Sequence, residues 1–130
     1  MIAKSVHHIS FAVADLTASL DFYQGLLGLE SIERPDFGIP GAWLSAGSAQ
    51  VHLIEKPDGA EVGSPPPSLS PIANHQAFAI EDYAATLAML KQRGIEVMET
   101  SPEQGQLWIR DPDGHVIELI DPRGRGAGTR

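Results

Sequence analysis

Three histidines and one glutamate stand at corresponding positions in two halves of the chain. His8 corresponds to His75 at an offset of 67 residues, and His52 corresponds to Glu118 at an offset of 66. Imidazole nitrogens and carboxylate oxygens are ligands that zinc, nickel, manganese and iron(II) all accept. The four residues are therefore candidate ligands of one divalent metal ion, provided that the fold brings them together.

The two halves repeat one order of segments. Residues 7–23, HHISFAVADLTASLDFY, align with residues 74–90, NHQAFAIEDYAATLAML. Residues 42–55, AWLSAGSAQVHLIE, align with residues 107–121, LWIRDPDGHVIELID. In each half a strand of alternating character precedes a helical pattern, and further strands follow. We therefore expect two βαβββ-like units of about 50 residues each.

The predicted helices carry matching start and stop signals. Asp15 and Asp82 are predicted N-caps, and Gly28 and Gly94 are predicted to follow the last turns. Apolar residues recur between them at helical spacing. In the first helix these are Leu16, Leu20, Tyr23 and Leu27, and in the second they are Tyr83, Leu87 and Leu90.

The alternation of side chains along each strand places all four candidate ligands on the face that is turned away from the helix. His8, for example, alternates with Ile9 and Phe11, so it points away from the apolar side that packs on the helix. The same holds for the other three. If the units pair about a pseudo-twofold axis, the four side chains converge in a partly dry cleft. A lone strand histidine is more often a hydrogen-bonded, half-buried residue, but four polar groups buried together favour a divalent cation.

Other polar and aromatic residues are candidates for substrate contacts. Trp43 and Trp108 correspond in the repeat and are either pocket walls or paired core aromatics. Arg34 and Arg110 either meet an anionic substrate or are solvated surface residues. His7 precedes His8 and so points to the opposite face of the strand, and His115 lies at the DPDG turn. We interpret both as surface residues. The candidate substrate-binding residues are Phe11, Arg34, Trp43 and Trp108.

Composition excludes several classes of protein. The chain has 130 residues, of which 42% are hydrophobic, and this suits one domain with a sizeable core. It has no cysteine, so a disulfide framework and a cysteine-based zinc site are excluded. The net charge of −8, without an internal basic stripe, argues against nucleic acid as a partner. With no signal-like or membrane-spanning segment, we expect no membrane association and a cytoplasmic location.

The domain boundaries follow from the repeat and from a shift in composition. We expect one domain over residues 1–130, with module 1 at about 4–56 and module 2 at about 73–122. A Pro-rich linker at about 57–72 separates the modules, and a flexible tail covers 123–130.

The chain resembles the vicinal oxygen chelate superfamily, which includes glyoxalase I, fosfomycin-resistance proteins and extradiol dioxygenases. HHISFAVADLTASLDFYQGLLGL is similar to its N-terminal signature, and DPDGHVIELID is similar to its C-terminal one. The resemblance covers about residues 4–122 and implies an α+β fold in which paired βαβββ modules form an open mixed β-barrel around a metal-site cleft. It implies His8, His52, His75 and Glu118 as metal ligands. It also implies a homodimer.

The departures from the family pattern bear on the chemistry. Bacterial glyoxalase I has a glutamate where this chain has His52. Among the four candidate ligands Glu118 is therefore the only carboxylate, and it is the candidate catalytic base. A divalent ion with one carboxylate ligand keeps a net charge of about +1 and is a stronger Lewis acid. Ala12 and Lys56 stand where glutathione-binding residues are expected, which weakens the case for glutathione as co-substrate.

The resemblance implies a metal-dependent isomerase or lyase of the glyoxalase I type, acting on a small α-oxo or α-hydroxy carbonyl compound. The alternatives are an extradiol-type dioxygenase, in which His52 would fill a position needed by oxygen or catechol, and a fosfomycin-type thiol transferase. A further alternative, from a different class, is a metal-free drug-binding protein of the bleomycin-resistance kind. The metal, whether zinc, nickel, manganese or iron, is not specified by the sequence.

Overall fold

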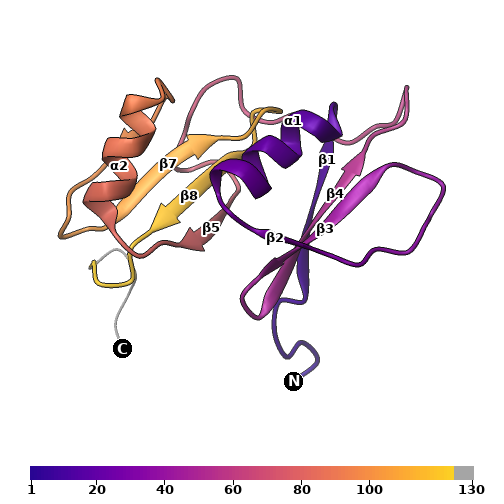
Figure 1. The fold of residues 1–130 in the computed structure, drawn as a ribbon, viewed down its shortest axis with the longest axis horizontal. Helices are drawn as coiled ribbons and strands as arrows, with labels where there is room; N and C mark the ends of the chain where they lie inside the picture. Colours follow the sequence, from indigo (N-terminus) through magenta and orange to yellow (C-terminus); the bar gives the residue numbers. More distant parts are fainter. Residues whose placement is uncertain (125–130) are drawn as a thin grey trace. The chain divides into compact units, whose positions relative to one another are not determined.

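Each half of the chain folds around one four-stranded mixed sheet (Figure 1). The computed structural model describes residues 1–124, so residues 125–130 of the expected tail lie outside the described residues. The chain forms two compact units, Met1–Ser64 and Pro65–Arg130, whose boundary lies within the Pro-rich linker. Within residues 1–124 no helix is long and apolar enough to cross a membrane.

The first unit has the order strand, helix, strand, strand, strand. Its sheet has the spatial order β1-β4-β3-β2, in which β1 and β4 are parallel and the other neighbours are antiparallel. The elements are β1 (His8–Val13), α1 (Leu16–Leu20), the π-helix η1 (Asp21–Leu26), β2 (Glu30–Ile32), β3 (Gly41–Ala46) and β4 (Ala49–Glu55).

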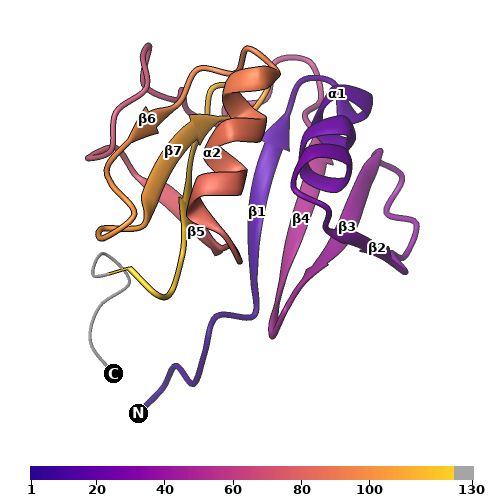
Figure 2. The ribbon, with the colours of Figure 1, turned by 60° about the vertical axis from the view of Figure 1, so that its left-hand side comes forward.

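The second unit repeats this topology. Its sheet has the order β5-β8-β7-β6, and β5 pairs with β8 in parallel. The elements are β5 (His75–Ala79), α2 (Tyr83–Gln92), β6 (Met98–Glu99), β7 (Gln106–Arg110) and β8 (Val116–Ile120), and Figure 2 shows α2 from the side. The predicted α+β class and the two βαβββ units are confirmed.

The predicted helix signals act as expected at both ends. Asp15 accepts the backbone N–H groups of Thr17 and Ala18, and Asp82 accepts that of Ala85. Gly28 and Gly94 take positive φ values of 79° and 70°, a conformation that favours glycine.

The first helix differs from the regular α-helix that the spacing predicts. After Leu20 it continues as a π-helix, and the N–H of Leu27 donates to the carbonyl of Phe22, five residues back, over 2.9 Å. Phe22 and Tyr23 of this segment are both buried, although the 3.6-residue period selects only Tyr23. Tyr23 stacks on Phe11 of β1 with ring centroids 5.3 Å apart. The helical segment therefore covers the face of the sheet that carries Phe11.

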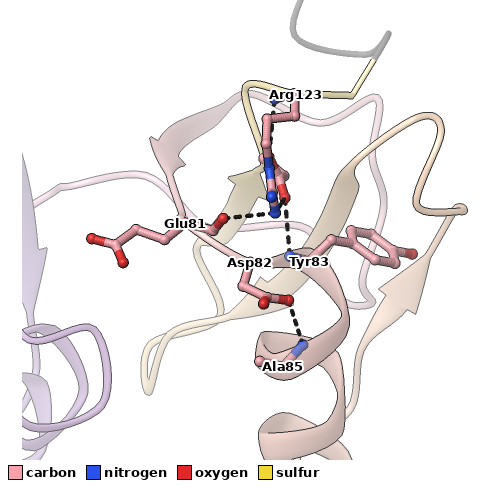
Figure 3. A network of polar contacts seen from close by, with 6 residues as sticks. Glu81, Asp82, Tyr83, Ala85 and Arg123 are labelled. Atoms are coloured by element: carbon pink, nitrogen blue, oxygen red, sulfur yellow. Dashed lines mark hydrogen bonds and ion pairs between the residues drawn. The ribbon is translucent and has the colours of Figure 1, made fainter.

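In each unit a carboxylate at the end of the last strand accepts a backbone N–H at the start of the helix. In unit 1, Glu55 Oε2 accepts the N–H of Leu16 over 3.0 Å, and in unit 2, Asp121 Oδ2 accepts the N–H of Tyr83 over 3.1 Å. Arg123 donates to Asp121 through Nε and Nη2, over 3.0 Å and 2.8 Å, and Nη2 also donates to the carbonyl of Glu81 (Figure 3). The hydrogen bonds from Arg123 hold the pKa of the Asp121 carboxyl well below its usual range.

This pKa shift predicts how stability depends on pH. A carboxyl whose pKa is lower in the folded than in the unfolded chain stabilises the fold above its unfolded pKa of about 3.9, and this contribution is lost as the pH falls toward the folded pKa. Asp121→Asn should therefore lower the thermal midpoint at pH 7. The difference from wild type should stay constant between about pH 5 and 8 and shrink below about pH 4.

Thermal unfolding followed by circular dichroism across this pH range measures the effect. Asp58→Asn makes the same charge change at an exposed residue and serves as the matched control. A difference for Asp121→Asn that stays constant down to pH 2, or an equal one for Asp58→Asn, would contradict the assignment.

Candidate functional site

In unit 1, His8 and His52 stack on each other. Ser10 of β1 lies directly opposite His52 of β4, so His8 is its diagonal neighbour. The ring centroids of His8 and His52 are 4.0 Å apart at an interplanar angle of 13°. Trp43 of β3 lies opposite His52 and stacks on its other side, at 4.3 Å and 7°. These two stacks leave His52 only 7% exposed.

Each imidazole of this pair has a polar neighbour on one ring nitrogen. His52 Nε2 lies 2.8 Å from Oε1 of Gln50, which accepts a proton held on Nε2 and leaves the lone pair on Nδ1. His8 Nδ1 lies 2.9 Å from Nδ1 of His7. Burial lowers the pKa of His52, and electrostatic interaction with His8, His7 and Arg34 lowers it further. The neutral imidazole that this favours is the form that binds a metal.

In unit 2, His75 and Glu118 contact each other directly. Ala77 of β5 lies opposite Glu118 of β8, so His75 is the diagonal neighbour, as His8 is to His52 in unit 1. His75 Nε2 lies 2.9 Å from Oε1 of Glu118. Nδ1 lies 2.7 Å from the carbonyl oxygen of Ala73, which fixes a proton on Nδ1. A carbonyl partner on Nδ1 is an arrangement that orients a histidine to bind metal through Nε2.

The carboxylate of Glu118 is buried, and each of its oxygens has a polar neighbour. The residue is 6% exposed, and Nε2 of Gln106 donates to Oε2 over 3.2 Å while Oε1 faces His75. Trp108 of β7 lies opposite Glu118, as Trp43 lies opposite His52. Its Nε1 is buried without a hydrogen-bond acceptor. The structure thus brings the candidate ligands together in two pairs, one in each unit.

The other candidate substrate-binding residues lie in different surroundings. Phe11 is 9% exposed and packs on Tyr23, on the helix side of the sheet. Arg34 lies over the ring of Phe37, with Cζ 5.0 Å from the ring centroid. Arg110 is ion-paired with Glu96 over 2.7 Å, so its charge is compensated within unit 2.

Three polar neighbours of the candidate ligands were not selected from the sequence. Gln50 and Gln106 each stand two residues before a selected residue, His52 and Trp108, and so share its strand face. The two-residue spacing along the strand is therefore the sequence signal that identifies Gln50 and Gln106 as neighbours of the site. His7 is exposed, as predicted for a surface residue, yet it also contacts His8. Within residues 1–124 no three histidine, aspartate or glutamate side chains form a group that could hold a metal ion.

The repeated topology, with a polar pair on the first and last strands of each unit, defines a protein built from two βαβββ modules. The model of the Glyoxalase/Bleomycin resistance protein/Dioxygenase superfamily matches residues 5–119. The chain belongs to this superfamily, as its sequence signatures predicted.

Similar proteins include enzymes and a binding protein. The chain is 31% identical to "Glyoxylase I 4" of Arabidopsis thaliana over 90% of this chain and 70% of the relative. It is also 31% identical to the metallothiol transferase FosB of Staphylococcus epidermidis, over 92% of this chain and 82% of the relative. An antibiotic-binding protein from Streptomyces sp. CB03234 is similar in structure, with a TM-score of 0.69, 25% identity and coverage of 94% of this chain and 98% of that one.

The contact between Gln106 and Glu118 generates a prediction about stability. Gln106→Leu removes the donor to a buried carboxylate oxygen, and we expect a loss of about 1–3 kcal/mol in the free energy of unfolding. Urea unfolding measures it, with Gln104→Leu as the control because Gln104 is exposed. Equal midpoints for the two variants would show that Gln106 does not stabilise Glu118.

Proposed function

We propose that the chain is a metal-dependent enzyme of the glyoxalase I-like type, which performs an isomerisation or lyase step on a small α-oxo or α-hydroxy carbonyl compound. The observation that carries this proposal is the repeated register. His8 with His52, and His75 with Glu118, occupy the same diagonal position on the parallel first and last strands of their units. A histidine pair and a histidine–carboxylate pair together make a donor set suited to one divalent ion.

The surroundings of these side chains suit metal ligands. The contact with Gln50 leaves a free lone pair on one nitrogen of His52, and the bond to the Ala73 carbonyl fixes the tautomer of His75. Gln106 orients the carboxylate of Glu118. We therefore propose His8, His52, His75 and Glu118 as the ligands of zinc, nickel, manganese or iron(II). Such an ion, when bound, supplies Lewis-acid stabilisation to a developing oxyanion.

Side chains in and around this donor set would transfer the proton and contact the substrate. Glu118 is the one carboxylate among the four, and we assign it the transfer of a proton to and from the substrate. Its oxygen Oε2 keeps one lone pair beyond the contact with Gln106, and the buried setting keeps competing water away. Trp43 and Trp108 each lie opposite a proposed ligand and would form walls beside the substrate.

A thiol transferase is the second candidate function. The relative FosB, at 31% identity, is a metallothiol transferase, and two histidines and one glutamate would serve such an enzyme. His52 is then the additional ligand. The products separate the two candidates, because a transferase leaves the thiol in a stable thioether, whereas isomerisation of a hemithioacetal leaves it in a thioester that hydroxylamine cleaves.

The two pairs hold one ion either within one chain or between the two chains of a homodimer. Mixing His52→Ala chains with His75→Ala chains distinguishes these arrangements. Only in the dimeric arrangement does a mixed dimer contain one site with all four ligands, and only then does mixing restore activity.

The role of Glu118 can be tested directly. Glu118→Gln keeps the shape and one oxygen donor but cannot accept the proton, so turnover should fall by about 100-fold or more while most of the metal stays bound. Turnover of α-oxo and α-hydroxy carbonyl compounds, both acids and aldehydes, is measured with and without glutathione. Metal content by plasma mass spectrometry is measured on the same samples. Glu103→Gln, an exposed glutamate, is the control. Normal turnover by Glu118→Gln would refute the proposed proton transfer.

A further inference from the structure

Arg34 occupies the space above a glycine. A Cβ atom added at Gly41, the first residue of β3, would lie 2.8 Å from both Cζ and Nη2 of Arg34. This is closer than carbon and nitrogen atoms approach without displacement, so the guanidinium rests where any other residue would place its side chain. The same Cβ would lie 2.5 Å from the carbonyl oxygen of Leu53, so the backbone also requires glycine here.

The guanidinium lies on the face of the sheet that carries the proposed ligands of unit 1. Residues two apart in a strand project from the same face, so the missing side chain of Gly41 and the side chain of Trp43 share a face. Trp43 stacks on His52. Arg34, which comes from the loop between β2 and β3, thus reaches the face of the candidate metal ligands.

An aromatic ring holds the guanidinium from a second direction. Cζ of Arg34 lies 5.0 Å from the centroid of the Phe37 ring, which is a cation–π distance. Phe37 in turn lies 6.0 Å from Trp43, between ring centroids, and is 58% exposed. The guanidinium thus lies beside both the Phe37 ring and the backbone of Gly41, and the exposed ring leaves this part of the surface open to a small molecule.

The charge of Arg34 has no carboxylate partner among the ion pairs of the described residues. Its Nε is buried and has no hydrogen-bond acceptor. Arg110 and Arg123 differ, since each is paired with a carboxylate over 2.7 Å and 2.8 Å. A buried donor without an acceptor costs stability and needs an explanation, such as a ligand that supplies the acceptor.

The surroundings offer room for that ligand. Arg34 lines a groove of about 520 Å³, together with Pro35, Asp36, Gly38, Pro40 and Gly41. The carboxylate of Asp36 accepts the N–H of Gly38 over 2.8 Å and so is engaged within the loop. A planar guanidinium without a carboxylate partner is suited to bidentate binding of an anionic oxygen group.

We propose that Arg34 binds the anionic oxygen group of a small molecule, a carboxylate or a phosphonate, on the ligand-bearing face of unit 1. As a statement about the substrate, this rests on the proposed function: the compound is then an acid, such as an α-oxo or α-hydroxy acid, and not a neutral aldehyde. As a binding site for an anion, it stands without the metal and is tested without it.

Nuclear magnetic resonance of the full-length, ¹⁵N-labelled protein tests the site. Acetate, methylphosphonate and uncharged acetamide are titrated at constant ionic strength, with and without prior removal of metal by a chelator. The two anions should shift the amide signal of Gly41 and the indole signal of Trp43, and acetamide should not. The anion with the lower dissociation constant identifies the preferred group as a carboxylate or a phosphonate.

The variants decide whether Arg34 is responsible. Arg34→Gln should weaken binding of the anion by about tenfold or more, and Arg34→Lys, which keeps the charge but loses the planar fork, should weaken it less. Arg110→Gln removes an arginine that is already paired and should leave binding unchanged. Should Arg34→Gln fail to fold, as judged from its amide spectrum, the comparison of Arg34→Lys with Arg110→Gln decides.

Binding of an anion that survives in Arg34→Gln, or is weakened equally in Arg110→Gln, overturns the proposal, as does the absence of shifts with both anions. Binding that persists after chelation supports the site even if the protein holds no metal. Failure of this site and failure of the proposed metal enzyme are therefore distinguishable.

Discussion

The parallel pairing of the first and last strands of each unit is the constraint on which the candidate site depends. β1 and β4, like β5 and β8, are neighbours in the sheet although a helix and two strands separate them in sequence. This pairing brings His8 against His52 and His75 against Glu118, at the same register in both units. A shift of one residue in either pairing would turn the proposed ligand toward the helix side and replace it with an apolar neighbour.

The two pairs share a position but differ in electrostatics. In unit 1 two imidazoles stack face to face beside Trp43, and burial together with neighbouring positive charge favours the neutral form of His52. In unit 2 an imidazole faces a buried carboxylate that a glutamine also holds. The duplicated fold thus provides two imidazoles in one half, and an imidazole with a carboxylate in the other. This asymmetry is what assigns proton transfer to Glu118 in the proposed function.

Local signals in the sequence predicted the parts of the fold that depend on local physics. The caps Asp15 and Asp82, the glycines Gly28 and Gly94, and the two βαβββ units were all predictable, because capping, positive φ and strand alternation act over a few residues. The internal repeat then selected the four candidate ligands, and the strand register of the structure showed how they pair within each unit. The π-helical turn, with its bond from Leu27 to Phe22, was not predictable, since the apolar spacing of the segment fits a regular α-helix. The position of Arg34 over Gly41 was not predictable either, because a loop residue and a strand residue meet there only in three dimensions.

The most direct test of the central claim is a metal titration of four purified proteins: wild type, His52→Ala, His75→Ala and, as a control, His115→Ala. If both pairs hold one ion, the wild type and the control bind about one equivalent per chain, and either of the other two substitutions weakens binding strongly. Metal binding that is lost in only one of these two variants would show that a single unit holds the ion. No binding by the wild type, even after reconstitution, would contradict the metal site itself and favour a binding protein of the same fold.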